Sequence, residues 1–299
     1  MAAPQLWLIN ARSGNGAGRN LLRALSNRHD VVAVSLDFDT LAEQLTQSAH
    51  ASRLVVAGGD GTFASVLCAL SLPDIPVAVM PLGTANDLAR ELGISQRVKG
   101  ISTNDLPDLF ARLPVRDFAT WNLRNGSRIV PFCNYASIGY EGKVVSDFSA
   151  WRSRTRLSGR WINRFMYSLF GTKNMLSRIH GLAVRADDAP MQHCGPMLGV
   201  LLTNIRSHLG LGFSNGVGSP FDSRLECISS STALSYISML GASLHVASAP
   251  TPLVSGERIE ISGVPRGTAL QIDGEPGGIL EDPIVSVELR RFVKVAVAA

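Results

Sequence analysis

Residues Val55–Thr62 read VVAGGDGT, and residues Met80–Asp87 read MPLGTAND. Each stretch begins in a short apolar run that is typical of a buried strand, and each leads into a segment with helical spacing. The pattern therefore predicts two strands that deliver glycines, hydroxyls and carboxylates to one edge of a sheet. Glycine allows a ligand to approach the backbone closely, and the start of a helix presents unpaired amides to an anion such as phosphate.

Two common phosphate-binding loops are excluded by the spacing of these residues. Neither stretch has the GxxxxGK[ST] pattern, and the first lysine of the chain is Lys99, far from both glycine turns. No GxGxxG follows the first predicted strand in the form that binds dinucleotides. Taken alone, Gly58-Gly59-Asp60-Gly61 is also compatible with a tight loop in which Asp60 caps a helix.

The composition is that of a globular protein with room for two modest domains. The chain has 299 residues, of which 45% are hydrophobic and 17% charged, with a formal net charge of +4. Its four cysteines are dispersed and form no CxxC pair, which favours buried thiols in a reducing compartment. No apolar run approaches the length of a membrane span, and the first residues do not resemble a secretion signal. We therefore expect a cytoplasmic protein.

The order of predicted elements changes near Leu113. Before it, apolar runs alternate with helical segments, which predicts a parallel sheet with helices on both faces and ligands beyond the carboxyl ends of its strands. After it, short β-rich runs are broken by Gly, Pro, Asn and Ser, which predicts an antiparallel sandwich or barrel.

A basic and aromatic segment interrupts the second part of the chain. Between Phe148 and Ala186 there is no acidic residue, while eight Lys and Arg side chains are interleaved with large apolar ones. Peripheral membrane surfaces select this mixture. A helix that packs on the core and exposes a basic face would give the same pattern, and nucleic acid is the weakest of the three alternatives because no recognition motif accompanies the segment.

The combination of GGDGT with PLGTAND resembles the diacylglycerol kinase catalytic family, which also contains sphingosine and ceramide kinases and bacterial soluble lipid kinases. GGDGT alone would also suit NAD kinases, and PLGTAND favours the lipid kinases. The resemblance implies a Rossmann-like α/β nucleotide-binding domain over residues 1–114 and a lipid-acceptor β-sandwich over residues 115–290. It further implies an active cleft between the two domains and a segment, 291–299, that returns to the first domain.

The resemblance also implies a nucleotide site. A kinase needs a phosphate cradle, magnesium to neutralise charge and a base for the acceptor hydroxyl. Residues 10–16 stand where the family has NPxSG, with Ala11 replacing the proline. Asp60 would bind Mg²⁺ directly or through water, and Asp117 matches a family aspartate that joins this network through water. The expected nucleotide contacts are Asn10, Ser13, Gly14, Thr40, Gly58, Gly59, Asp60, Gly61, Thr62, Thr84, Asn86 and Asp87.

Two further sites are implied by the resemblance. Asp273, in LQIDGE, corresponds to the family's general base, with Glu275 as its partner or as the actual proton acceptor; alone, Asp-Gly is a common hairpin turn. The segment SPFDSRLE resembles a structural magnesium site, in which the Asp222 carboxylate would join the carbonyls of Ser219 and Arg224. Ser223 replaces the family's glycine there.

The expected function is therefore that of an ATP-dependent lipid kinase with Mg²⁺ as cofactor. Its acceptor would be the hydroxyl of a diacylglycerol-like or a sphingoid or ceramide lipid, and residues 148–186 would contact the inner face of a membrane peripherally. No nucleic acid is expected, and a homodimer is left open. Two alternatives stand beside this reading: a kinase of a soluble acceptor, of the NAD-kinase type, and an inactive sensor that binds nucleotide or lipid.

Overall fold

The computed structural model describes residues 3–71, 74–83, 86–155, 160–175, 177–208, 213–214, 216–230 and 250–298. The chain divides into two compact units. Unit 1 comprises Met1–Thr120, Ser207–Gly212 and Arg291–Ala299, and unit 2 comprises Trp121–Arg206 and Phe213–Arg290. The last segment of the chain thus groups with its first 120 residues.

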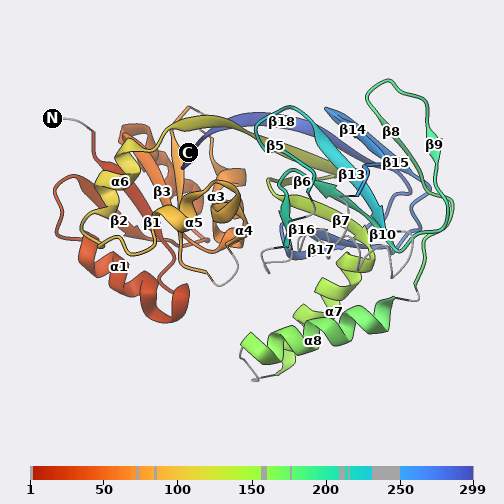
Figure 1. Ribbon diagram of the computed structural model, residues 1–299, viewed down its shortest axis with the longest axis horizontal. Helices are drawn as coiled ribbons and strands as arrows, with labels where there is room; N and C mark the ends of the chain where they lie inside the picture. The colour runs from red at the N-terminus through yellow and green to blue at the C-terminus, as the bar shows by residue number, and fades with distance from the viewer. Residues whose placement is uncertain are drawn as a thin grey trace. The chain divides into compact units, whose positions relative to one another are not determined.

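Unit 1 is built on the parallel strands β1 (Gln5–Ile9), β2 (Val31–Ser35), β3 (Arg53–Gly58) and β4 (Val77–Pro81), in the order β2-β1-β3-β4 (Figure 1). All residues of β1 and β3 are buried, as expected for central strands of a parallel sheet that is covered on both faces. In this unit, Val295 of β18 (Val285–Ala296) pairs in parallel with Val77 of β4.

Helices of unit 1 connect these strands and cover the sheet. They are α1 (Ala17–Leu25), α2 (Leu41–Thr46), α3 (Asp60–Ala69), α4 (Asp87–Glu91), α5 (Ile94–Arg97) and α6 (Leu106–Arg112), with short 3₁₀ turns at Gly14–Gly16 and Gln47–His50. The strand–helix alternation predicted for this part of the chain is confirmed.

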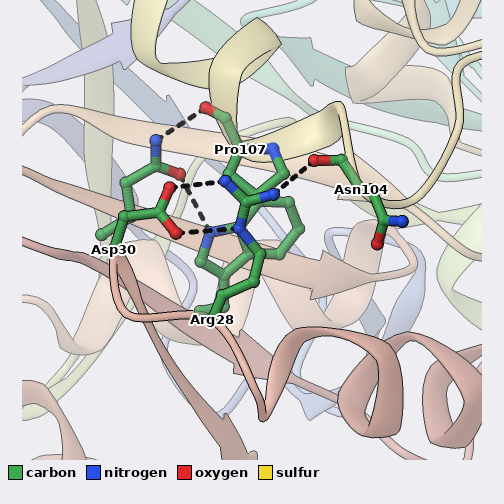
Figure 2. Close-up of polar contacts among 6 residues, drawn as sticks. Arg28, Asp30, Asn104 and Pro107 are labelled. Carbon is green, nitrogen blue, oxygen red and sulfur yellow. Dashed lines mark hydrogen bonds and ion pairs between the residues drawn. The ribbon is translucent and has the colours of Figure 1, made fainter.

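A polar network attaches α6 to the amino ends of β1 and β2 (Figure 2). The Arg28 guanidinium donates to both carboxylate oxygens of Asp30, at 2.8 and 2.7 Å, and to the Asn104 carbonyl at 2.6 Å. Gln5 donates from Nε2 to the Pro107 carbonyl at 2.7 Å. These bonds lie at the end of the sheet opposite the glycine turns, so they stabilise the unit without occupying the carboxyl edge.

Unit 2 contains two antiparallel sheets, which confirms the predicted fold class. The first has the order β14 (Val254–Gly256), β13 (Leu225–Ser230), β10 (Gly199–Thr203), β7 (Tyr135–Gly139), β16 (Ala269–Ile272) and β17 (Glu275–Ile279). The second joins β18 to β15 (Arg258–Ser262), β8 (Ala183–Ala186) and β9 (Gln192–His193), and β5 (Val115–Asn125) pairs with β18 and with β6 (Arg128–Phe132). Of the two short remaining strands, β11 (Ser207–His208) belongs to unit 1 and β12 (Phe213–Ser214) to unit 2.

The basic segment begins within α7 (Tyr140–Arg154) and continues through α8 (Arg160–Asn174), and these two helices contact each other (Figure 1). Tyr140 and Val144 of α7 form a buried cluster with Leu198 and Ile228, and Phe170 of α8 packs against it. One face of the helix pair therefore belongs to the core of unit 2.

Candidate nucleotide and catalytic sites

The first glycine turn joins β3 to α3 in unit 1. Gly59 is extended, with φ −97° and ψ −178°, and α3 begins at the next residue, Asp60. A Cβ atom added to Gly58 would lie 2.6 Å from the Cβ of Thr62. The Thr62 hydroxyl in turn accepts a hydrogen bond of 3.0 Å from Nδ2 of Asn10, in the loop after β1. Because the Thr62 side chain fills this space, there is no room for a side chain at Gly58. Gly61 lies next to Thr62 in the first turn of α3.

Three glycine-bearing loops converge at the carboxyl edge of the sheet. The amide of Leu82 donates to the Gly58 carbonyl at 2.8 Å, and a Cβ on Gly83 would lie only 2.9 Å from the Cα of Gly59. Gly14 has φ +66°, and a Cβ there would lie 2.6 Å from the Leu82 carbonyl oxygen. The loops after β1, β3 and β4 thus pack backbone against backbone, as a phosphate cradle requires.

Asp60 links the two glycine motifs. Its Oδ2 accepts the amide hydrogen of Asp87 at 2.8 Å, and its Oδ1 accepts that of Leu88 at 3.1 Å, so Asp60 satisfies the first amides of α4. The residue before this helix, Asn86, has φ +54° and donates from Nδ2 to the Gly83 carbonyl at 2.6 Å. The hydrogen bond from the Asp87 amide to Asp60 therefore joins the motif at residues 80–87 to the motif at residues 55–62.

Burial is the main reason why the pKa of Asp60 is raised to about 6, and the nearby carboxylate of Asp87 raises it further. Asp87 is 3% exposed and forms an ion pair of 2.5 Å with Arg90. Arg90 was missed in the sequence, although a basic residue three positions after an acidic one on a helix is a recognisable signal.

The remaining nucleotide and metal candidates that the structure describes in unit 1 lie in the loop after β1, just before α2 and on β5. The amide of Ser13 donates to the Asn10 carbonyl at 3.0 Å, which keeps Ser13 in the loop after β1. Thr40 precedes α2 and is exposed. Thr84 lies outside the described residues. Asp117 of β5 has a side chain 54% exposed and forms an ion pair of 2.6 Å with Lys294 of β18.

Asp273 lies in unit 2 at the turn between β16 and β17. It has φ +48° and is followed by Gly274 with φ +90°, so the Asp-Gly pair does form the hairpin turn that its sequence favours. Its carboxylate nevertheless accepts three backbone amides: those of Asn134 and Tyr135 on Oδ1, at 2.7 and 3.1 Å, and that of Cys133 on Oδ2, at 3.0 Å.

These contacts set the charge state of Asp273. Burial raises the pKa of Asp273 to about 6, and the three amides oppose the shift by stabilising the carboxylate. Asp273 is half-buried, whereas Glu275 is exposed at the start of β17. The contact of Asp273 with the amides of 133–135 could not be predicted from local sequence, because these residues are 138 to 140 positions away from Asp273.

The third candidate site, in residues 219–226 of unit 2, is a tight turn. Oδ1 of Asp222 accepts the Arg224 amide at 2.9 Å, and the hydroxyl of Ser219 accepts the Phe221 amide at 3.4 Å. The Arg224 side chain donates to the Ser255 carbonyl at 2.6 Å. Glu226 was not among the candidates, although burial and the charge of Asp222 raise its pKa to about 7.

Asp60 and Asp87 fit the requirements of a magnesium ion better than those of a softer metal. Both offer hard carboxylate oxygens, and Arg90 already offsets part of their mutual repulsion. Within the described residues, no three His, Cys, Asp or Glu side chains gather to form a metal-binding group. A cation held here would therefore complete its shell with phosphate oxygens and water, as Mg²⁺ usually does.

Among the helices of the described ranges, none has the length and apolarity needed to cross a membrane.

Comparison with known proteins places these features in a family. Residues 4–106 match the diacylglycerol kinase catalytic domain, and residues 131–276 match the diacylglycerol kinase accessory domain. Diacylglycerol kinase 2 of Arabidopsis thaliana is 28% identical over 318 residues, which cover 92% of this chain and 43% of that protein. Human diacylglycerol kinase theta is 28% identical over 313 residues, which cover 92% of this chain and 33% of that protein. The chain thus spans less than half the length of these relatives.

Solved structures share the fold at low sequence identity. A diacylglycerol kinase from Bacillus anthracis str. Sterne has a TM-score of 0.67 at 15% identity and covers 99% of this chain and 97% of its own. Yeast NADH kinase, complexed with NADH, has a TM-score of 0.56 at 13% identity and covers 100% of this chain and 84% of its own. Because both domain models match in order over most of its length, the chain belongs to the diacylglycerol kinase catalytic family.

Proposed function

We propose that the protein is an ATP-dependent kinase that transfers the γ-phosphoryl group to the hydroxyl of a diacylglycerol-like or sphingoid lipid. The observation that carries the proposal is the close packing of Gly59 against Gly83, which joins the two motifs into one backbone cradle. The names of the relatives, which are diacylglycerol kinases, support a lipid acceptor.

In unit 1, the loops after β1, β3 and β4 bind the phosphates through backbone amides. Asn10 orients Thr62 by its hydrogen bond of 3.0 Å, and Asp60 holds the start of α4 against the first glycine turn. Asp60 would hold Mg²⁺ directly or through water, Asp117 would contribute through water, and Asp87 would contact the nucleotide. When bound, the ion neutralises charge on the transferred phosphoryl group.

Asp273 is the general base in this proposal. Its carboxylate takes the proton of the lipid hydroxyl as the oxygen bonds to the γ-phosphorus, and ADP leaves with the electrons of the broken P–O bond. The raised pKa of about 6 gives a base that is ionised at neutral pH yet more basic than an ordinary aspartate. The amides of 133–135 fix the orientation of the carboxylate. Glu275, which is exposed and close in sequence, is the alternative proton acceptor.

The helix pair α7–α8 is proposed as the membrane contact. Ile162 and Leu169 of α8 are 38% and 48% exposed, and their spacing of seven, with Met166 between them, puts them on one face of the helix. Arg152, Arg154 and Lys173 of the same pair are exposed. Each basic residue near an anionic lipid surface contributes about 1 kcal/mol of attraction.

A structural magnesium ion at the tight turn of residues 219–226 also remains a proposal. The Asp222 carboxylate and the carbonyls of Ser219 and Arg224 would supply hard oxygen ligands, and water would complete the shell.

The test is transfer of labelled γ-phosphate from ATP with Mg²⁺ in mixed micelles. The acceptors are diacylglycerol, monoacylglycerol, sphingosine, ceramide and NAD, each offered separately. A labelled lipid supports the proposal and identifies the acceptor. Label on NAD alone contradicts it in favour of a kinase of a soluble acceptor, and ATP binding without any transfer contradicts it in favour of an inactive sensor.

A further inference from the structure

Residues 133–135, whose amides bond the Asp273 carboxylate, lead into β7 in unit 2. In the sheet, β7 lies between β10 and β16. On the β16 side, the amide of Asp273 donates to the Tyr135 carbonyl at 2.9 Å. On the β10 side, the amide of Asn204, the residue just after β10, donates to the Asn134 carbonyl at 2.9 Å. The backbone of 133–135 is therefore held between Asp273 and Asn204.

The side chain of Asn204 holds the same backbone at a second point. Its Nδ2 donates to the Cys133 carbonyl at 2.7 Å. Asn204 and Cys133 are both completely buried, so this hydrogen bond is not in competition with bulk water. Asn204 thus donates to two successive carbonyls, one from its backbone and one from its side chain.

Two peptide groups connect Asn204 to the Asp273 carboxylate. The Cys133 carbonyl and the Asn134 amide belong to one planar peptide group, and the Asn134 carbonyl and the Tyr135 amide belong to the next. Asn204 donates to both carbonyls, and both amides donate to Oδ1 of Asp273, at 2.7 and 3.1 Å. Because the peptide group is planar, fixing the carbonyl also fixes the direction of the amide. A hydrogen bond at the carbonyl further polarises the group and strengthens the bond that its amide donates.

Trp121 sets the orientation of the Asn204 side chain. Its Nε1 donates to Oδ1 of Asn204 at 3.0 Å, and Trp121 is completely buried. An indole N–H is a donor only, so it requires the amide oxygen opposite it and leaves the NH₂ group to face the Cys133 carbonyl. In the pairing of β5 with β6, Trp121 lies opposite Phe132, the residue before Cys133.

A buried asparagine that bonds backbone can also serve the fold alone, and Asn125 is such a residue in the same unit. It is 7% exposed, and its Nδ2 donates to the carbonyls of Asp282 and Ile284 at 2.8 and 3.0 Å. What distinguishes Asn204 is the identity of its partners, which are the peptide groups that bond Asp273. Asn125 therefore provides a matched control for Asn204.

We propose that Asn204 is a positioning residue for Asp273, which holds two peptide groups of residues 133–135 so that their amides face one oxygen of the carboxylate. The proposal rests on the proposed function, because it takes Asp273 as the general base. Trp121 acts one step further away, by keeping the Asn204 amide in the orientation that reaches the Cys133 carbonyl.

The first test measures kcat and KM for transfer of labelled phosphate from ATP to the lipid acceptor, with the full chain in mixed micelles. Asn204→Ala should lower kcat about tenfold, because the base is then held less well. The KM for ATP should stay within twofold, because the glycine turns of unit 1 are unchanged. Asn125→Ala should lower the melting temperature as Asn204→Ala does, yet keep the wild-type kcat.

The pH dependence of kcat gives a readout that a purely structural role would not move. The acid limb of the wild-type profile is expected near pH 6, the pKa of Asp273. Two or three backbone amides lower the pKa of a carboxylate by about two units, so weakening one of them should move the limb up by roughly half a unit. The Cys133 thiol lowers this pKa as the amides do, and it is retained in every variant. Asn125→Ala should leave the limb in place.

Two further variants keep the test decisive. Trp121→Phe retains a ring in the buried site and removes the indole N–H, so it should shift kcat and the acid limb in the same direction as Asn204→Ala but by less. If Asn204→Ala does not fold, Trp121→Phe decides by the same two readouts. In an Asp273→Asn background, Asn204→Ala should have no further effect on kcat, because the carboxylate through which it acts is gone.

The outcomes separate this inference from the proposed function. If the wild-type chain is active and both Asn204→Ala and Trp121→Phe match its kcat and acid limb, the positioning role is wrong while the kinase proposal stands. A fall in kcat that is equally large in the Asp273→Asn background also overturns the role, because the loss would not pass through the carboxylate. If the wild-type chain transfers phosphate to no acceptor, the kinase proposal itself fails, and the positioning role fails with it.

Discussion

The carboxylate of Asp60 accepts the amide hydrogen of Asp87 at 2.8 Å. This hydrogen bond connects the two glycine motifs at the carboxyl edge of the sheet. Asp60 therefore has a structural role in addition to its proposed contact with Mg²⁺. Each carboxylate oxygen of Asp60 accepts one amide, which leaves acceptor capacity on both for a cation or water. The hydrogen bonds that Asp60 accepts and its proposed contact with Mg²⁺ are therefore compatible.

Stability should depend on pH through Asp60. Its pKa is raised to about 6 in the folded protein and is near 3.8 in an unfolded chain. Between these values only the folded state binds the proton, so the stabilisation is present below pH 3.8 and is lost as pH rises through 6. Asp60→Asn should reduce this loss. Urea unfolding of both proteins from pH 4.5 to 7.5 measures it, and an identical pH dependence in the variant would contradict the assignment.

Gly83→Ala should disrupt the phosphate edge. The new Cβ would lie 2.9 Å from the Cα of Gly59 and 2.9 Å from Oδ1 of Asn86, so the two loops must separate. We expect a loss of about 1–3 kcal/mol in the free energy of unfolding, as for overpacking in a core, together with weaker ATP binding. Gly195→Ala is the control, because its Cβ would meet nothing within 4 Å. Equal stability of the two variants would show that the loops tolerate separation.

Asp273→Asn should strongly reduce the rate of transfer while ATP binding persists. Removal of a general base lowers the rate by about 10² to 10⁴, and the wild-type rate should itself fall as pH drops below about 6, where Asp273 becomes protonated. The new Nδ2 would face the Cys133 amide if Oδ1 kept its two partners, so thermal unfolding must accompany the assay.

Glu275→Gln is the matched variant for this prediction, because Glu275 is exposed and its substitution leaves the turn intact. It should retain most of the transfer rate. Loss of transfer in Glu275→Gln with activity retained in Asp273→Asn would reverse the assignment of the base.

Asp117→Asn should change the magnesium requirement more than the stability. The ion pair of Asp117 with Lys294 is exposed on both sides, and such pairs contribute little to folding. If Asp117 joins the magnesium network through water, the Mg²⁺ concentration that gives half-maximal transfer should rise, with an unchanged melting temperature. Lys294→Met removes the same ion pair and should leave the Mg²⁺ requirement alone. Matching Mg²⁺ titrations for wild type and Asp117→Asn would remove Asp117 from the network.

Local features of the fold were predictable from the sequence, and contacts between distant segments were not. The buried runs of β1 and β3 and the Asp273–Gly274 turn follow from apolar patterning and turn chemistry. The capping of α4 by Asp60 and the pairing of Asp117 with Lys294 depend on how far-apart segments meet, which no local pattern encodes.

In the basic segment, too, the sequence indicated helices but not which of their faces make contacts. Its sequence left a core-packed helix and a membrane-contacting helix as alternatives, and the two are compatible because they concern different faces. Phe170 packs against the cluster around Tyr140, whereas Ile162 and Leu169 are exposed. Periodicity alone could not assign these faces, because large apolar residues occur on both.

Membrane binding should therefore depend on the exposed face of α8. Replacing Ile162 and Leu169 together by Ser should lower partitioning to vesicles that contain anionic lipid, because about 1.5–3 kcal/mol is associated with burying each such side chain. The fold should persist, since both side chains are largely in water. Vesicle sedimentation measures the partitioning, and Ile284→Ser, which removes an exposed isoleucine outside the helix pair, is the control. Binding that is unchanged in the double variant but abolished by salt would assign the contact to the basic residues alone.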